Sequence, residues 1–448
     1  MSNKGLPFLG EFKLGAILPM AIFRAPRGVQ DILPQSAPVW VQLQSTARAI
    51  CERYGFAFIE TPIFEEAALF VRGVGAETDI VQKEMYTFED RGGVQLTLRP
   101  EFTAGIMRAY IEHGMHTWPQ PVKLYSLGPA FRYERPQAGR FRQFHQFNIE
   151  AIGEPDPLID AEVILLMWRY LQELGLNRLN LQLNSIGCPA CRPPYVEALK
   201  SYYSGLRRSL CSDCQERLHR NPLRLLDCKA ASCQALLQEA PRSVDFLCPS
   251  CAGHFQELRL LLEAAELPYE LNPRLVRGLD YYTKTVFEIW AEGIGAQNAV
   301  CGGGRYDGLA EALGFRSTPG VGAAAGLERL LMLLQGHGQA ERPSAALAVF
   351  IPLAGPARPL SLKLAEELRL AGLPAQCTYG DRSLKAQLKS ADRLGAQYAI
   401  ILGEDELAHG QATVRCLGRS EQVQVPLARL VDWLKEQAAV PAGERAVQ

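Results

Sequence analysis

Residues 131–150 read FRYERPQAGRFRQFHQFNIE, and this stretch decides how the fold is interpreted. It holds four arginines within eleven positions, namely Arg132, Arg135, Arg140 and Arg142. Pro136 and Gly139 interrupt them, whereas the flanking segments 131–134 and 142–150 are compatible with β-strands. We therefore expect two strands joined by a long basic loop. Arginine forks suit phosphate oxygens, although an isolated charged loop is more often a solvated hairpin.

Polar residues continue beyond this loop into the second expected strand. They are Gln143, His145, Gln146, Asn148 and Glu150. Because side chains alternate between the two faces of a strand, such a strand would aim several of these polar groups at one site.

The length and composition of the chain limit its class. With 448 residues, two or three domains are expected. The net charge of −1 means that any polyanion site must be a local basic patch. No apolar run reaches the roughly 20 residues that span a bilayer, and Glu11 and Lys13 break the apolar N-terminus, so neither a membrane anchor nor a signal peptide is expected. We expect a cytoplasmic protein, in which residues 1–19 are an extension preceding a second possible start at Met20.

The order of the expected elements indicates the α/β class, with an α+β catalytic domain. Ser36 is a candidate helix N-cap, and Gly55 ends the helix that follows. Strands come in runs rather than in regular alternation with helices, which favours a largely antiparallel sheet flanked by helices. Helices are expected over 39–54, 102–113, 160–174 and 327–334. Strands are expected over 56–60, with a buried character, and over 95–98, 122–126, 131–134, 143–151, 179–185, 275–290 and 299–304.

The pattern changes after a polar segment rich in glycine and proline. Residues 336–344 read GHGQAERPS, which is typical of a linker. Strands and helices then alternate, predicting a small α/β domain of about 95 residues. The strands are expected over 345–352, 375–379, 398–402 and 412–416, and the helices over 359–371, 383–394 and 427–437.

Eight of the twelve cysteines lie close together in the chain. They are Cys188, Cys191, Cys211, Cys214, Cys228, Cys233, Cys248 and Cys251. Cysteine pairs with two residues between their members are typical of tetrahedral Zn²⁺ sites, and the first two such pairs have 19 residues between them. Sulfur-only ligation favours a structural ion over a catalytic one. The spacing leaves open which pairs combine, and reduced thiols that pack without metal are the alternative.

Three further segments are unusually rich in glycine or in polar and aromatic residues. RGLDYY at 277–282 could build a polar pocket at strand spacing, and the adjacent glycines of GGGRYDG at 302–308 imply that something approaches them closely. GVGAAAG at 320–326 lacks the spacing of a dinucleotide fingerprint and is better explained by close packing. Arg329 follows on a helix, where it could hold a phosphate.

Together these segments resemble a class II histidyl-tRNA synthetase from about residue 23 to residue 437. GFAFIETP at 55–62 is similar to motif 1, residues 128–150 to motif 2, and residues 320–329 to motif 3. RGLDYY and GGGRYDG are similar to the two histidine-specific signatures of that family. The resemblance implies activation of L-histidine with ATP and Mg²⁺ to histidyl-adenylate, transfer to tRNA(His), and a homodimer built through motif 1.

The resemblance also implies residue roles. Arg277 and Arg132 would be catalytic, stabilising charge at the carboxylate and the α-phosphate. The expected histidine-binding residues are Glu101, Thr103, Arg132, Gln146, Glu150, Arg277, Tyr281 and Tyr282. The expected ATP-binding residues are Arg132, Glu134, Arg140 and Arg329. The expected tRNA-binding residues are Arg135, Arg142, Arg382, Lys385 and Lys389.

One departure from the family concerns the segment RPEFT at 99–103, in which Phe102 replaces the glycine of the family's RPEGT. Phe102 is expected to add bulk beside the site of the α-amino group. Glu101 and Thr103 are kept, so we expect activity to persist with altered local packing.

The domain organisation follows from these assignments. We expect an extension over 1–22, a catalytic core over 23–187 and 256–336, a helical Cys-rich insertion over 188–255, a linker over 337–344 and an anticodon-binding domain over 345–440. The main alternative is a non-catalytic, synthetase-like regulatory subunit of histidine biosynthesis. Such proteins usually lack the C-terminal domain and the ATP-binding arginines, which this chain retains. A structural nucleic-acid-binding protein would explain the cysteines but not the histidine signatures.

Overall fold

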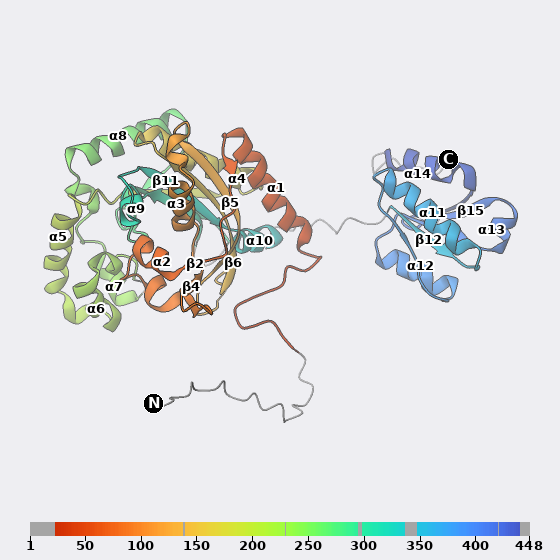
Figure 1. Ribbon diagram of the computed structural model, residues 1–448, viewed down its shortest axis with the longest axis horizontal. Helices are drawn as coiled ribbons and strands as arrows, with labels where there is room; N and C mark the ends of the chain where they lie inside the picture. The colour runs from red at the N-terminus through yellow and green to blue at the C-terminus, as the bar shows by residue number, and fades with distance from the viewer. Residues whose placement is uncertain are drawn as a thin grey trace, which may run out of the picture. The chain divides into compact units, whose positions relative to one another are not determined.

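The computed structural model describes residues 23–137, 139–228, 230–293, 298–336, 347–419 and 421–439 (Figure 1). The chain divides into two compact units, Met1–Ala340 and Glu341–Gln448, which are described separately. The extension expected over 1–22 and the linker expected over 337–344 lie outside the described residues. The finer domain boundaries stay a prediction.

The first unit is built on an eight-stranded sheet in the order β1-β5-β6-β11-β10-β9-β7-β8. All its inner pairs are antiparallel, and only the pairs at the two edges, β1 with β5 and β7 with β8, are parallel. The predicted antiparallel sheet is therefore confirmed. The strands are β1 Ala57–Phe58, β5 Val122–Phe131, β6 Gln143–Ile152, β7 Leu179–Ser185, β8 Glu270–Leu271, β9 Thr283–Ala291, β10 Ala299–Arg305 and β11 Gly320–Gly326.

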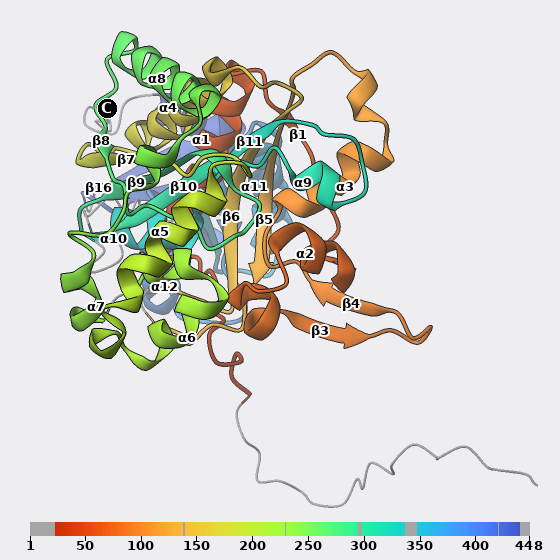
Figure 2. The same cartoon turned by 90° about the vertical axis from the view of Figure 1, so that its left-hand side faces the viewer.

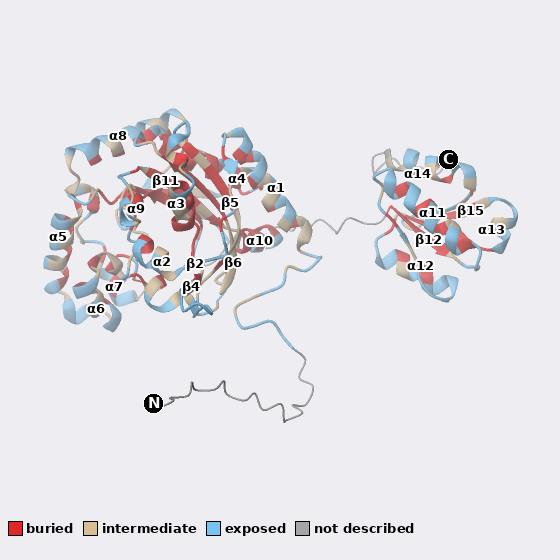
Figure 3. Ribbon diagram, in the orientation of Figure 1, coloured by how far each residue is buried: buried red, intermediate tan, exposed pale blue. Residues whose placement is uncertain are grey.

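Alternation along β6 sets the two faces of this sheet. Phe147, Ile149 and Ala151 are fully buried in the main hydrophobic core. Figure 3 shows buried segments in the strands and in the helices packed against them. The helices that contribute to this core are α1 Ala37–Arg53, α4 Pro157–Glu173, α8 Pro249–Ala264 and α10 Leu327–Gly336. The even-numbered residues of β6 face the other way, where a second core includes residues of α3 Thr103–Glu112 and α9 Leu309–Ala312. Helix α2 Ala67–Val74 packs against α3.

A small three-stranded sheet accompanies the large one, in the order β2-β4-β3. Its strands are β2 Phe64–Glu66, β3 Tyr86–Glu89 and β4 Gln95–Leu98. Figure 2 shows the β3–β4 hairpin extending away from the large sheet.

The Cys-rich insertion is helical, as predicted, and has a small core of its own. Tyr195, Leu199, Leu218 and Leu225 are among its buried residues. Its α-helices are α5 Arg192–Ser204, α6 Ser212–Arg220 and α7 Ala231–Leu236, and α8 leads back to the sheet (Figure 1). Short 3-10 turns at Arg207–Ser209, Pro222–Leu225 and Ser243–Phe246 connect these helices.

Two expected strands differ from the structure. Strand β5 runs to Phe131, so the segment 132–134 already belongs to the basic loop. Residues 275–282 form turns, and β9 begins only at Thr283. The backbone amide of Asp280 donates to the carbonyl of Val74, 3.1 Å away, because this segment bonds to the end of α2 instead of to a neighbouring strand.

The first helix and the following strand also differ in detail. Helix α1 begins after Ser36 and ends before Gly55 as predicted, but the Ser36 hydroxyl does not cap it and instead accepts from Gln335 at 2.8 Å. The segment 56–60 is a strand for two residues only, and Phe58 is 53% exposed. It is not buried because β1 lies at the edge of the sheet and pairs with β5 alone.

The second unit is a five-stranded sheet in the order β13-β12-β14-β15-β16, with helices around it. Its strands are β12 Ala348–Pro352, β13 Ala375–Cys377, β14 Tyr398–Leu402, β15 Gln411–Cys416 and β16 Glu421–Pro426. Its helices are α11 Ala357–Leu370, α12 Leu384–Arg393, α13 Glu404–Ala408 and α14 Leu427–Ala439. The predicted α/β domain is confirmed; β16 and α13 were not predicted. Among the described residues of both units, no helix is long and apolar enough to cross a bilayer.

Candidate active site

Two adjoining cavities lie on the polar side of β6. The smaller has a volume of about 50 Å³, and the larger about 210 Å³. Five residues line both, namely Arg132, Gln146, Arg277, Gly302 and Ala324. The basic loop, the strand that follows it and the glycine-rich strands therefore meet in one place.

The smaller cavity brings together seven of the eight residues expected to bind histidine. They are Glu101, Thr103, Arg132, Gln146, Arg277, Tyr281 and Tyr282. Sequence reasoning did not assign Asn148, Leu279, Tyr306 or Gly322–Ala324 to this wall. The quoted glycine-rich signature contains Tyr306, so the signal was present but was attributed to its glycines.

Glu150, the eighth expected residue, lies directly behind the wall of the smaller cavity. Its carboxylate accepts from the Thr103 hydroxyl at 2.6 Å and from the Tyr306 hydroxyl at 2.6 Å. The side chain is 1% exposed, and burial raises the pKa of Glu150 to about 8. Gly322 lies opposite on β11, where a β-carbon would stand 1.8 Å from the Glu150 carboxylate. The chain thus holds a buried, satisfied carboxyl group against the cavity.

Glu101 lies at the start of α3 and is almost fully buried. Its carboxylate accepts from the backbone amides of Thr103 at 2.7 Å and Ala104 at 2.9 Å. This satisfies helix donors that would otherwise lack partners and fixes Glu101 in the cavity wall. Burial raises the pKa of Glu101, although these hydrogen bonds oppose the shift.

Phe102 occupies a different place from the one expected. Its ring is 1% exposed and packs beneath Arg99, whose guanidinium carbon is 4.0 Å from the ring centroid. The described walls of the two cavities do not include Phe102. Since Arg99 also donates to the carbonyls of Thr61 and Pro129, the phenyl ring fills the core behind the site instead of crowding the site itself.

Arg305 anchors the strand end that carries Tyr306. Its guanidinium is fully buried and pairs with Asp160 at 2.6 Å. It also donates to the backbone carbonyls of Glu154 and Asp156, each 3.0 Å away. A buried charge is tolerated only when it is paired and hydrogen-bonded, so this network holds the position of the neighbouring tyrosine.

The larger cavity gathers the four residues expected to bind ATP: Arg132, Glu134, Arg140 and Arg329. Arg140 pairs with Glu134 at 3.0 Å. Arg329 donates to the backbone carbonyls of Gly139 at 3.0 Å and Ala299 at 2.7 Å. Burial and the nearby Arg140 charge lower the pKa of Arg329. Such a cluster of partly buried cations favours a polyanionic ligand.

Arg132 and Arg277 connect the two cavities. The Arg132 guanidinium donates to the carbonyl of Pro100 at 2.9 Å, and Arg277 pairs with Glu288 at 2.6 Å. Gly302 leaves room for Arg277, because a β-carbon there would lie 2.4 Å from its guanidinium nitrogen. Both arginines are thereby oriented before any ligand arrives.

The polar residues of β6 do not all point to one site. Gln146, Asn148 and Glu150 face the smaller cavity, but His145 lies on the opposite face of the strand. The His145 ring contacts Trp40 with ring centroids 5.0 Å apart, and its Nδ1 lies 2.8 Å from the Glu328 carboxylate.

The residues expected to contact tRNA lie outside both cavities. In the first unit Arg135 is exposed, and the Arg142 guanidinium stacks 3.8 Å from the centre of the Tyr133 ring. In the second unit Arg382 precedes α12, and Lys385 and Lys389 are exposed one turn apart on that helix.

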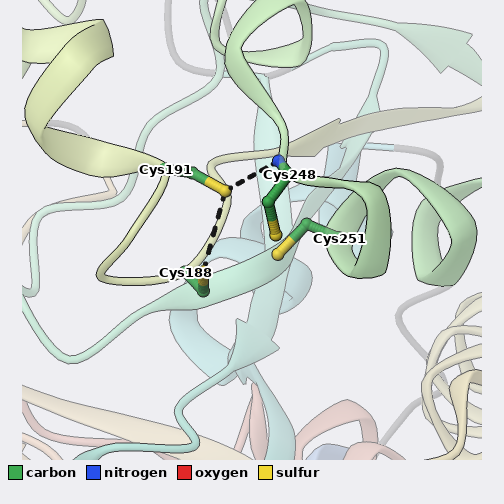
Figure 4. Close-up of side chains that lie close together, drawn as sticks. All are labelled: Cys188, Cys191, Cys248 and Cys251. Carbon is green, nitrogen blue, oxygen red and sulfur yellow. Dashed lines mark hydrogen bonds between the residues drawn. The ribbon is translucent and has the colours of Figure 1, made fainter.

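The eight clustered cysteines form two groups of four. Cys188, Cys191, Cys248 and Cys251 make the basal cluster (Figure 4), and Cys211, Cys214, Cys228 and Cys233 make the distal cluster. Within each group the sulfur atoms all lie within 4.8 Å of one another. The structure thus supplies the pairing that sequence spacing left open, and each group could hold a metal ion.

Comparisons with known proteins agree with this architecture. Residues 28–189 and 215–330 match the family model of histidyl-tRNA synthetase, and residues 348–437 match that of an anticodon binding domain. A histidine–tRNA ligase from Dehalococcoides mccartyi is 52% identical over 417 residues, which are 93% of this chain and 100% of that protein. A histidine–tRNA ligase from Moorella thermoacetica is 52% identical over 412 residues, which are 92% of this chain and 97% of that protein.

Solved structures show the same relationship. The crystal structure of apo S. aureus histidyl-tRNA synthetase is similar with a TM-score of 0.77 and 39% sequence identity, covering 92% of this chain and 100% of that one. A histidyl-tRNA synthetase from Nostoc, with 24% identity and a TM-score of 0.66, shares the fold.

Proposed function

The chain belongs to the histidyl-tRNA synthetase family and is an ATP-dependent histidine–tRNA ligase, and we propose how its own residues carry out that reaction. The histidine carboxylate attacks the α-phosphate of ATP and pyrophosphate leaves; a terminal ribose hydroxyl of tRNA then attacks the carbonyl carbon of the adenylate, and AMP leaves. The observation that carries the proposal is that Arg132 and Arg277 line both cavities. The reacting carboxylate and phosphate meet where the cavities join.

The smaller cavity is the histidine site. Glu101, Thr103 and Gln146 hold the α-amino group, and Glu150 and Tyr282 read the imidazole. Because Glu150 lies behind the cavity wall, it acts on the ligand indirectly. It orients the Thr103 and Tyr306 hydroxyls that hydrogen-bond to it, and it can gain or lose a proton when the imidazole binds. A site built on buried polar partners rejects side chains that cannot pair with them, by about 10⁴-fold in favourable cases.

The larger cavity takes the triphosphate of ATP. Arg132 contacts the α-phosphate, Arg329 the γ-phosphate, and Glu134 and Arg140 position the nucleotide. Phosphoryl transfer depends mainly on such positioning and charge stabilisation. Mg²⁺ would be held between the phosphates and the wall carboxylates of Glu134 and Glu288, an oxygen donor set that suits this ion, and would neutralise charge on the leaving pyrophosphate.

The remaining assignments concern tRNA, zinc, assembly and location. Arg135 and Arg142 face the acceptor end, and Arg382, Lys385 and Lys389 face the anticodon arm. Zinc is assigned to the two cysteine clusters, since soft thiolates favour it. The chain acts as a homodimer through motif 1, where Phe58 is 53% exposed, and Phe64 just after the motif is 54% exposed. A reducing compartment, the cytoplasm, suits its twelve free thiols.

The regulatory-subunit alternative has no observation in its favour. Such a subunit would be expected to lose the ATP-binding arginines, but Arg132, Arg277 and Arg329 line the larger cavity. The anticodon binding domain is also present.

The proposal is tested by histidine-dependent exchange of pyrophosphate with ATP, followed by charging of tRNA(His). Exchange that depends on histidine and is absent with other amino acids is expected. Exchange without charging would overturn the tRNA assignments, and the absence of exchange would overturn the site itself.

A further inference from the structure

The two cysteine clusters have the geometry of tetrahedral metal sites. The sulfurs of Cys188 and Cys191 are 3.7 Å apart, and those of Cys211 and Cys228 are 3.8 Å apart. Four sulfurs placed about 2.3 Å from one central zinc ion at tetrahedral angles would be about 3.8 Å apart. A disulfide needs about 2.05 Å. The observed separations exclude bonded pairs and fit ligands around an ion, and packed thiols would lie equally close.

Amide donors or helix N-termini favour a thiolate at four of the eight cysteines, namely Cys191, Cys211, Cys233 and Cys248. The backbone amide of Cys248 donates to the Cys191 sulfur at 3.1 Å, and that of Cys211 donates to the Cys233 sulfur at 3.3 Å. Cys191, Cys211 and Cys248 stand at the N-terminal ends of α5, α6 and α8, respectively, where the helix dipole stabilises negative charge. Four unpaired thiolates could not stay together in either cluster without a cation between them.

The basal cluster is joined to the histidine site by a short path. The Arg192 guanidinium, on the residue after Cys191, donates to the carbonyl of Tyr282 at 2.6 Å. Just before the cluster, the carbonyl of Gly187 accepts from the backbone amide of Lys284 at 2.7 Å. The chain that enters the cluster therefore holds the end of the turn at 277–282, whose two tyrosines line the smaller cavity.

The distal part of the insertion holds the middle of the same turn. Asn221, which lies between Cys214 and Cys228 in the chain, donates to the Asp280 carboxylate at 3.4 Å. Arg224 pairs with Asp79 at 3.0 Å, and its guanidinium lies where a β-carbon on Gly278 would be 3.2 Å away. The insertion thus contacts the turn on both sides of Tyr281.

We infer that two metal ions of zinc-like chemistry, one in each cluster, fold the insertion into a clamp that holds the turn 277–282 against the histidine cavity. This inference rests on the proposed histidine site. The ions act through the protein and touch no substrate, so Arg192 is a positioning residue. Without the ions the insertion core would loosen, the end of the turn that carries Tyr281 and Tyr282 would gain freedom, and histidine would bind more weakly, while Arg132, Arg140 and Arg329 of the larger cavity would stay in place.

The metal content of the full chain, purified without chelator, tests the first half. About two zinc ions per chain are expected. Cys191→Ser and Cys214→Ser should each lose about one ion, whereas Cys416→Ser, in the second unit, should keep both. Substitution with Co²⁺ should give the absorption of tetrahedral cobalt thiolates. A metal content near zero, or fewer than twelve titratable thiols in the unfolded chain, would overturn the metal sites.

Arg192→Met tests the clamp, with Arg208→Met, an exposed arginine of the same insertion, as the matched control. In pyrophosphate exchange, Arg192→Met should raise the KM for histidine about tenfold, as the loss of one charged hydrogen bond implies. Its KM for ATP and its metal content should stay unchanged, and Arg208→Met should resemble the wild type. An unchanged KM for histidine, or equal rises for both substrates, would overturn the clamp.

These outcomes are separable from those of the proposed function. If the wild-type chain gives no histidine-dependent exchange, the histidine site fails, while metal content and thiol titration still decide whether the clusters bind ions. If exchange proceeds normally in a chain that carries no metal, the inference about the clamp fails and the proposed function stands.

Discussion

The two cavities of the active site differ in how their polar groups are satisfied. In the smaller one, Glu150 accepts from Thr103 and Tyr306, and Glu101 accepts from two backbone amides, so the protein itself pairs the buried carboxyls. In the larger one, Arg140 and Arg329 are partly exposed, and burial lowers the pKa of Arg329.

This difference explains how one site can handle an amino acid and a triphosphate. A closed network of hydrogen bonds rejects a ligand that leaves any member unpaired, which gives specificity. An open cluster of cations attracts any polyphosphate and supplies charge during the reaction. Arg132 and Arg277 belong to both cavities, so we expect that only substitutions of these two residues affect the use of both histidine and ATP.

The largest effect is expected at Arg277. Arg277→Met should lower the rate of histidine-dependent pyrophosphate exchange by about 10²–10³-fold, because it removes a charge donor at the point where carboxylate and phosphate react. Glu288 would also lose its charged partner and keep only the hydrogen bond from the Trp290 indole, 2.9 Å long. Steady-state exchange, with each substrate varied in turn, measures this. A rise in only one KM, with the rate at saturating substrates unchanged, would place Arg277 in one cavity only.

A smaller and more selective effect is expected at Glu150. Glu150→Gln keeps the shape of the side chain but cannot ionise when the imidazole binds, so it cannot become a carboxylate that accepts from both hydroxyls. The KM for histidine should rise roughly 10–100-fold, as for the loss of one or two strong hydrogen bonds. The KM for ATP, measured in the same exchange assay, serves as the control, and a comparable rise there would contradict the division.

Arg329 provides the reverse test. Arg329→Met should raise the KM for ATP about tenfold, since one charge-assisted contact with phosphate is lost. The KM for histidine should change little. An effect of similar size on both substrates would show that the larger cavity does not act separately.

The smallest effect concerns pH and stability. Burial raises the pKa of Glu150 from its ordinary value of 4.5 to about 8. Between these two pH values Glu150 is protonated in the folded chain and ionised in the unfolded chain. Its contribution to stability is therefore complete below pH about 4.5 and is lost as the pH rises through about 8. Between pH 5.5 and 8.5 the thermal midpoint of the wild type should fall about 3–6 °C more than that of Glu150→Gln. Equal slopes would contradict the raised pKa.

The sequence predicted the elements whose periodicity is local. The alternation along β6 and the helices α4 and α10 follow from their own residues. The turn at 277–282 was misjudged because its backbone bonds to α2, a partner about 200 residues away in the chain that no local pattern reveals.

The candidate site was predictable where charge or glycine marked it. Tyr306 was not assigned because its role depends on Glu150, with which it pairs only after β10, β11 and β6 assemble. The combination of cysteine pairs was also undetermined. Spacing along the chain cannot show that the end of β7 and the start of α8 come together, as the basal cluster requires.

The most direct test of the division between the cavities is histidine binding without ATP, measured by titration calorimetry on three proteins. Arg329→Met should bind histidine as tightly as the wild type, and Glu150→Gln should bind it at least about tenfold more weakly. Equal weakening in both variants, or none in Glu150→Gln, would contradict the account.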